Sequence, residues 1–285
     1  MSPRILVTGA TGHIGSELVQ QLRTRAADFA VLRSPSGRAP EGVASVEGDL
    51  NDPQSLRRAF AGFDTLFLLL PLVPHKRALA EHAVQAARDA GVRHIVRSSG
   101  AGADATSPVA IARLQGEIDA LVQASGLNWT LLRPSFFMQN WVNLHLDQLK
   151  AGAYHAPNGD GAIGVIDVRD IAESAAVVLC NPQAHQGQVY TLTGGEALST
   201  AQQLKAISEV VGREIRYVDV PESATRQAME GMGMHPALVD WLMSLHHVVK
   251  QGWAAELTDD VRRLTGHAPR RFVDFVAEQA AVLRR

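Results

Sequence analysis

Short, fully apolar runs alternate along the chain with segments in which apolar residues recur every three or four positions. The runs predict strands buried on both faces, as a parallel sheet requires, and the periodic segments predict amphipathic helices. We expect strands at 5–7, 29–32, 43–46, 64–71, 128–132 and 190–193, and a fifth strand with its exit at 94–100. Helices are expected at 14–25, 53–60, 76–90, 109–124 and 171–179, and residues from 199 onward are mostly helical in pattern. This alternation predicts an α/β fold, a Rossmann-type doubly wound parallel sheet with helices on both faces.

At 285 residues, the chain is longer than one minimal nucleotide-binding sheet requires. We expect a nucleotide-binding domain over residues 1–150, to which a strand at about 187–194 returns. Residues 151–285 are expected to form a smaller, mostly helical substrate-binding portion. The two lobes would then interleave in sequence.

The first predicted strand runs directly into a glycine-rich turn. Gly9, Gly12 and Gly15 follow the apolar residues Ile5–Val7, and a helical pattern begins at once. Such a turn lets the backbone approach a pyrophosphate closely and directs helix N–H groups and the positive helix dipole at it. Because strand and helix flank the glycines as the motif requires, the spacing predicts a dinucleotide site rather than a turn that binds nothing.

The segment after the second strand carries arginines and no acid. It reads Arg33-Ser34-Pro35-Ser36-Gly37-Arg38. Enzymes that prefer NAD commonly place an acid here for the ribose 2′-hydroxyl, whereas a 2′-phosphate requires cationic or hydroxyl donors. A guanidinium donates two hydrogen bonds to a phosphate, so the segment favours NADP(H), with NAD(H) at lower preference. A solvated arginine loop is the alternative.

The ends of the next two strands also bear on the cofactor. Asp49 ends the third strand and could face the adenine or cap the helix that follows at Pro53. The fourth strand ends at Leu70 and Pro71, which are expected to lie over the cofactor because ligands bind at the carboxyl edge of such sheets.

The fifth strand ends in Ser98 and Ser99, where a short-chain dehydrogenase keeps its active-site serine. Those enzymes also need a tyrosine followed four residues later by a lysine. None of the three tyrosines of this chain, Tyr154, Tyr190 and Tyr217, has a lysine at that position. Without this proton donor, hydride addition to an ordinary ketone is costly. Hydride addition to a quinone gives a delocalised phenolate and addition to a cationic dye gives a neutral product, so such acceptors need positioning more than acid catalysis.

Apolar and aromatic residues follow the sixth strand, where an aromatic acceptor could stack. Phe137 and Trp141 either line this pocket or pack in the core, and Asn140 could orient the substrate. Candidate proton donors are Tyr154 and His155, which are expected to face the same pocket. A later cluster, interrupted by glycines, is either a hydrophobic lid or core. It includes Met232, Met234 and Trp241.

Composition narrows the class of partner. The 27 basic and 29 acidic residues nearly balance and the basic ones are scattered, which argues against nucleic acid or an anionic membrane. The lone cysteine, Cys180, excludes an internal disulfide, and the histidines show no metal spacing. With no apolar run long enough for a membrane span or a secretion signal, we expect a soluble cytoplasmic protein, either a monomer or a homodimer.

Several motifs together resemble the NmrA-like branch of atypical short-chain dehydrogenases. They are VTGATGHIG, VRSSGAG, GEIDALVQASGLNWTLLRPSFFMQN, IDVRDIAESAAVVL, YTLTGGEALS and LTDDVRRLTGHAP, in an order that spans nearly the whole chain. Within that branch the chain looks most like NAD(P)H-dependent reductases of quinones, azo dyes and triphenylmethane dyes. Where many members carry a lysine or histidine near position 115, this chain has Gln115.

The resemblance implies direct hydride transfer from NADP(H) without flavin, and roles for individual residues. The pyrophosphate would be held by Gly9, Thr11, Gly12, His13 and Ile14; the 2′-phosphate by Arg33 and Arg38; the adenine by Asp49 and Leu50; the nicotinamide ribose by Leu70, Pro71, Ser98 and Ser99; and the ring by Pro134, Ser135 and Phe136. We expect a reductase of small aromatic substrates without a metal, and the candidate catalytic residues are Ser98, Asn140, Tyr154 and His155. The alternatives are a non-catalytic NAD(P)-sensing regulator that binds a protein partner, or an enzyme of carbohydrate or isoprenoid-like substrates.

Overall fold

The computed structural model of the protein describes residues 2–284 and divides into two compact units. Unit 1 extends from the N-terminal strand to Pro108 and includes Ala112–Arg133 and Ile171–Thr191. Unit 2 comprises Val109–Ile111, Pro134–Asp170 and the chain from Leu192 onward. The polypeptide therefore passes repeatedly between the units, and a segment centred on residue 180 returns to unit 1.

A seven-stranded sheet dominates unit 1. Its strands are β1 (Ile5–Val7), β2 (Phe29–Arg33), β3 (Ser45–Glu47), β4 (Thr65–Leu68), β5 (His94–Ser98), β6 (Asn128–Pro134) and β9 (Gln188–Leu192), in the order β3-β2-β1-β4-β5-β6-β9. The pairings among β1 to β6 are all parallel. The predicted Rossmann-type sheet is confirmed, and its order reverses at β1, where ligands bind in folds of this kind.

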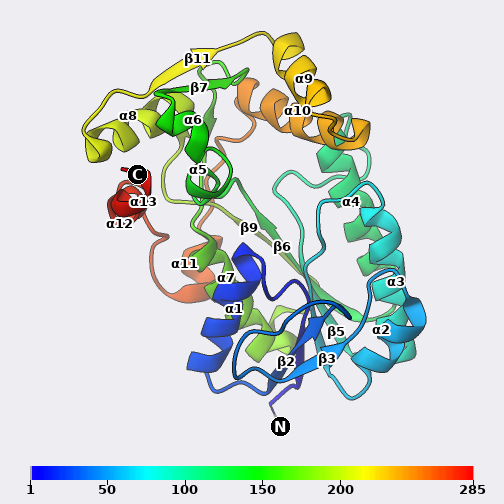
Figure 1. Cartoon of the computed structure of the whole chain (residues 1–285). Helices are drawn as coiled ribbons and strands as arrows, with labels where there is room; N and C mark the ends of the chain where they lie inside the picture. The colour runs from blue at the N-terminus through cyan, green and yellow to red at the C-terminus, as the bar shows by residue number, and fades with distance from the viewer. Residues whose placement is uncertain (1, 285) are drawn as a thin grey trace. The chain divides into compact units, whose positions relative to one another are not determined.

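Helices cover both faces of this sheet (Figure 1). They are α1 (His13–Thr24), α2 (Pro53–Phe60), α3 (Lys76–Asp89), α4 (Ala110–Gln123) and α7 (Val168–Cys180), followed by the short 3₁₀ helix η1 (Pro182–His185). Figure 1 shows α1 and α7 on one face and α2, α3 and α4 on the other. Each helix buries a stripe of apolar residues, as in α1, where Ile14, Leu18 and Leu22 are buried.

The fourth strand ends earlier than the apolar pattern predicts: β4 stops at Leu68 rather than at residue 71. The side chain of Thr8 accounts for this difference, because its hydroxyl donates to the carbonyl oxygen of Leu69 at 2.9 Å and accepts from the N–H of Leu69 at 2.8 Å. These bonds replace ladder bonds and turn the chain out of the sheet at its carboxyl edge.

Unit 2 is mostly helical, as predicted, with short strand pairs added. Its helices are α5 (Asn140–Asn143), α6 (Leu146–Lys150), α8 (Thr200–Val211), α9 (Glu222–Gly231), α10 (Pro236–Lys250), α11 (Asp260–Thr265), α12 (Phe272–Glu278) and α13 (Ala280–Leu283). Strand β7 (Ala153–Ala156) pairs in parallel with β11 (Arg216–Asp219), and β8 (Ala162–Ile163) pairs antiparallel with β10 (Leu198–Ser199). These four strands are short and only partly buried, so no continuous apolar run marks them in the sequence.

No helix within residues 2–284 is long and apolar enough to cross a membrane. Among the same residues, no group of three or more His, Cys, Asp and Glu side chains is placed to hold a metal ion.

Candidate functional site

The glycine turn between β1 and α1 depends on close backbone contacts. Gly9 adopts a φ of +68°, a left-handed conformation that favours glycine, and its carbonyl oxygen accepts from the N–H of Gly12 at 3.0 Å. A Cβ on Gly15 would lie 2.0 Å from the Gly9 carbonyl oxygen, so only glycine lets α1 begin this near the turn. The turn therefore has the geometry that brings backbone N–H groups to an anion.

A cavity of about 420 Å³ opens beside this turn, wholly within unit 1. The β1–α1 turn, the ends of β2 and β3 and the chain after β4 form its walls. The predicted cofactor residues that line it are Gly9, Thr11, Arg33, Arg38, Asp49, Leu50 and Pro71. Gly12, His13 and Ile14 continue directly into the first turn of α1, and Leu70, which precedes the lining residue Pro71, is buried. A cavity lined by the glycine turn and by two arginine side chains suits a phosphorylated dinucleotide.

The two predicted phosphate-binding arginines differ in their surroundings. Arg33 lies opposite Glu47 in the β2–β3 register, and its guanidinium forms an ion pair with that carboxylate at 2.8 Å. Arg38 is exposed, and no carboxylate within residues 2–284 pairs with it. A 2′-phosphate would therefore compete with Glu47 for Arg33 but would find Arg38 available.

Asp49 does not cap the helix that follows it. Asp52 caps α2 instead, accepting from the N–H of Gln54 at 2.9 Å. The Asp49 carboxylate accepts from the backbone N–H of Asn51 at 2.9 Å and from its side-chain amide at 3.0 Å, and these bonds lower the pKa of Asp49. Of the two roles weighed from the sequence, the cap is wrong, while Asp49 does line the cavity.

A buried ionic network lies at the end of β5. Arg97 is 1% exposed and forms an ion pair with Asp119 of α4, whose other carboxylate oxygen accepts from Arg133 Nη2 at 2.9 Å and Nε at 3.0 Å. Arg97 Nη1 donates to Ser99 Oγ at 2.8 Å. Ser98 is 5% exposed, and its Oγ has no hydrogen-bond partner within residues 2–284. The two predicted serines thus differ: Ser99 belongs to the network and Ser98 has a free hydroxyl.

Lys76 is a buried ionisable group at the start of α3, following the lining residues Val73 and His75. Burial, together with the nearby charge of Arg97, lowers its pKa to about 7. The sequence gives no sign of this role, because a single lysine at the start of a helix is usually solvated.

Lys76 should make the stability of the protein depend on pH. The native amine loses its proton near pH 7, whereas the unfolded amine keeps it to about 10.5, so stability rises with pH between these values. Lys76→Met should therefore raise the free energy of unfolding most at or below pH 7, by at most about 5 kcal/mol, and progressively less toward pH 10. The melting temperature should rise in parallel. Thermal unfolding across this range, with the exposed Lys205→Met in α8 as control, measures it; a pH-independent difference would contradict the assignment.

In unit 2, the predicted residues that follow β6 are held by backbone bonds. The N–H of Ser135 donates to the Leu192 carbonyl oxygen at 2.9 Å, and Phe137 bridges to Ile166. Phe136 packs against the core of unit 2, and Pro134 ends β6. Trp141 belongs to that core: its Nε1–H donates to the buried Gln203 Oε1 at 2.8 Å. Of the two roles weighed for Trp141, the core role is the one the contacts support.

Tyr154 and His155 cannot serve one pocket. They alternate on β7, so Tyr154 points into the core of unit 2 while His155 is exposed on the opposite face. The Tyr154 ring packs edge-on against Trp141 with 4.9 Å between ring centroids, and burial raises its pKa to about 12. The expectation of a shared pocket is therefore wrong, and Tyr154 is a poor acid at neutral pH.

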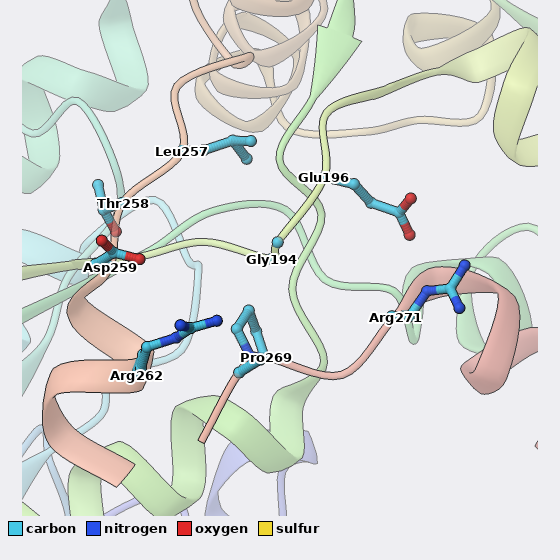
Figure 2. Close-up of a pocket in the computed structure, with 10 residues that line it drawn as sticks. Gly194, Glu196, Leu257, Thr258, Asp259, Arg262, Pro269 and Arg271 are labelled. Carbon is cyan, nitrogen blue, oxygen red and sulfur yellow. The ribbon is translucent and has the colours of Figure 1, made fainter. Parts of the chain in front are cut away.

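The remaining predicted pocket residues differ in how far they are exposed. Asn140 is half-buried at the start of α5. Met232 is 72% exposed after α9, Met234 is half-buried, and Trp241 is buried in α10. A second cavity in unit 2, of about 500 Å³, is lined by other residues, including Glu196, Asp259, Arg262 and Arg271 (Figure 2). The two carboxylates and two guanidiniums in its lining balance in charge, so the cavity favours neither anionic nor cationic ligands.

Comparison with known proteins identifies one family and several reductases as similar to this chain. A family model described as the NmrA-like family matches residues 1–250. The chain is 39% identical to an NAD(P)H azoreductase of Xenophilus azovorans over 281 residues, 97% of this chain and 98% of the relative. A solved NADPH-dependent quinone oxidoreductase of Escherichia coli in complex with NADPH is 26% identical, with a TM-score of 0.85 over 96% of this chain and 99% of that one. The Citrobacter sp. triphenylmethane reductase complexed with NADP(H) is 25% identical, with a TM-score of 0.82 over 97% and 99%.

Proposed function

The chain belongs to the NmrA-like family, and we propose that it is an NADPH-dependent oxidoreductase that passes hydride to an electron-poor aromatic acceptor. The acceptor would be a quinone, an azo dye or a triphenylmethane dye, reduced without flavin or metal. The observation that carries the proposal is the cavity of unit 1, in which the glycine turn and Arg38 meet the ends of the central strands.

Each wall of this cavity suits one part of the cofactor. The backbone N–H groups of the turn and of the first turn of α1 would hold the pyrophosphate, because they lie at the positive end of the helix dipole. Arg38, with Arg33 released from Glu47, would hold the 2′-phosphate. Asp49 and Leu50 would border the adenine. Ser98 and Ser99 lie outside the lining of this cavity, at the carboxyl end of β5, and would border the nicotinamide ribose.

When bound, NADPH supplies a hydride from the nicotinamide ring. The protein's own contribution is to bind and orient this ring at the carboxyl edge of the sheet and to keep the acceptor beside it. No tyrosine of this chain has a lysine four residues after it, so the protein lacks the usual proton donor of short-chain dehydrogenases. It therefore favours acceptors that take up hydride without simultaneous proton donation. The names of the three relatives, which act on azo compounds, quinones and triphenylmethane dyes, support acceptors of this class.

The test is the fall in NADPH absorbance with a benzoquinone, an azo dye, a cationic triphenylmethane dye and a simple ketone. We expect oxidation by aromatic acceptors and none by the ketone. Arg38→Ala should raise the KM for NADPH about 10-fold or more and leave that for NADH unchanged, because a charge-assisted phosphate contact is lost. Arg216→Ala, an exposed arginine of β11, should change neither.

Two results would oppose the proposal. Tight NADPH binding without oxidation by any acceptor would favour the NAD(P)-sensing regulator. Equal losses for NADPH and NADH in Arg38→Ala would remove the 2′-phosphate role from Arg38.

A further inference from the structure

The side chain of Gln115 is fixed by Arg97. Gln115 lies on α4, and its Oε1 accepts from Arg97 Nη2 at 2.5 Å. Arg97 Nη1 also donates to the backbone oxygen of Gln115 at 3.1 Å. Arg97 itself is held by its ion pair with Asp119 and its bond to Ser99 Oγ. Because the guanidinium is fully buried and bonded on several sides, it forms a rigid support for the Gln115 amide.

This contact decides which way the amide points. A guanidinium only donates hydrogen bonds, so the Gln115 atom that faces it must be the oxygen. The NH₂ group therefore points away from the ionic network. Within residues 2–284, Gln115 Nε2 has no hydrogen-bond partner, and the side chain is only half-buried. Nε2 is a free donor whose direction is set by a buried cation.

The free donor lies at the edge of the sheet that the nucleotide cavity occupies. A Cβ on Gly100 would be 3.7 Å from Gln115 Nε2, so the amide lies above the chain just after β5. Strand β5 pairs with β4, and the chain after β4 lines the cavity through Pro71 and Val73. Gln115 thus stands beside the expected nicotinamide end of the cofactor, in the same unit.

Hydride addition creates a need for such a donor. A quinone that takes up hydride becomes a hydroquinone monoanion while NADPH becomes NADP⁺, and the anion then takes one proton from solvent. A donor aimed at the oxygen that becomes negative lowers the barrier without giving up its own proton. The bond from Arg97 to Oε1 polarises the amide and strengthens donation by its NH₂ group.

We propose that Gln115, oriented by Arg97, donates a hydrogen bond to the acceptor atom that gains negative charge during reduction. This inference rests on the proposed reductase function. It adds a substrate preference. A donor that is oriented and polarised by Arg97 assists acceptors that become anions on reduction, such as quinones. It does not assist a cationic dye, which becomes neutral on reduction.

Gln115→Glu separates this role from support of the fold. The carboxylate has the shape of the amide and can accept from Arg97, so the melting temperature should stay the same or rise, and NADPH affinity, measured by fluorescence titration, should change by less than about 3-fold. The kcat for a neutral benzoquinone should fall about 100-fold, because a donor is replaced by a negative charge. The kcat for a cationic triphenylmethane dye should fall by less than about 3-fold.

Two further variants control the comparison. Gln115→Met removes the donor without adding charge and should also lower kcat for the quinone more than for the dye. Gln123→Glu makes the same charge change at an exposed position of α4 and should leave both rates unchanged. Equal quinone turnover in wild type and Gln115→Glu, or equal losses for quinone and dye, would overturn the inference alone. Absence of NADPH oxidation by wild-type protein would overturn the proposed function and this inference with it.

Discussion

Replacing Asp119 with asparagine is expected to destabilise the protein by about 3–5 kcal/mol, because it leaves a buried guanidinium without its counter-charge. Asp119 is 1% exposed, and the Arg97 with which it pairs is equally buried. Arg133, the second partner, is partly exposed and can be solvated by water. Chemical denaturation of wild type and Asp119→Asn measures the difference.

A surface ion pair gives a matched control for this substitution. Arg226 and Asp240 are separated by 2.9 Å, as are Arg133 and Asp119, but both members of the surface pair are largely exposed. Asp240→Asn should cost less than about 1 kcal/mol. The double variant Arg97→Met with Asp119→Leu should recover much of the lost stability, since no buried charge is left unpaired. A similar cost at both aspartates would contradict this account of the network.

The second large effect is expected at Gly15. Gly15→Ala should lower NADPH affinity by about 100-fold or more, because the added Cβ would lie 2.0 Å from the Gly9 carbonyl oxygen and 2.7 Å from Ala10 Cα. Backbone atoms cannot move aside as a flexible side chain can, so the turn must open. Fluorescence titration of NADPH measures the loss, and thermal unfolding should show a lower melting temperature.

Gly231→Ala is the control for this change. Gly231 also lies in a helix, and a Cβ there meets no atom within 4 Å. Alanine should be neutral or stabilise by up to about 1 kcal/mol, since glycine is the weaker helix former. If Gly15→Ala binds NADPH as wild type does, the turn does not hold the pyrophosphate.

Much of unit 1 could be predicted because its chemistry is local in sequence. Buried parallel strands appear as apolar runs, and the glycine turn must occupy consecutive residues between β1 and α1. For the same reason, the cavity-lining residues Arg33, Arg38 and Asp49 were found from the ends of their strands. The exact end of β4 was not, because a bond from Thr8 across the sheet sets it.

The interactions that were missed depend on which surfaces meet in three dimensions. The pair of Arg33 with Glu47 follows from the β2–β3 register, and register is not visible in either strand alone. Arg97 looks like one polar residue in an apolar strand until α4 brings Gln115 and Asp119 against it. Likewise, the side chains of Tyr154 and His155 can be assigned to opposite faces only once β7 is known to be a strand.

The measurement that tests the account most directly is the transfer of deuterium from NADPH labelled at the reactive nicotinamide carbon to a cationic triphenylmethane dye. The central carbon of the dye keeps a transferred hydride, so mass spectrometry of the colourless product reads the result. The account predicts one deuterium at this carbon, with protein as purified and no added flavin. Colourless product without deuterium would show that the hydride passes through an exchanging carrier, which would contradict direct transfer.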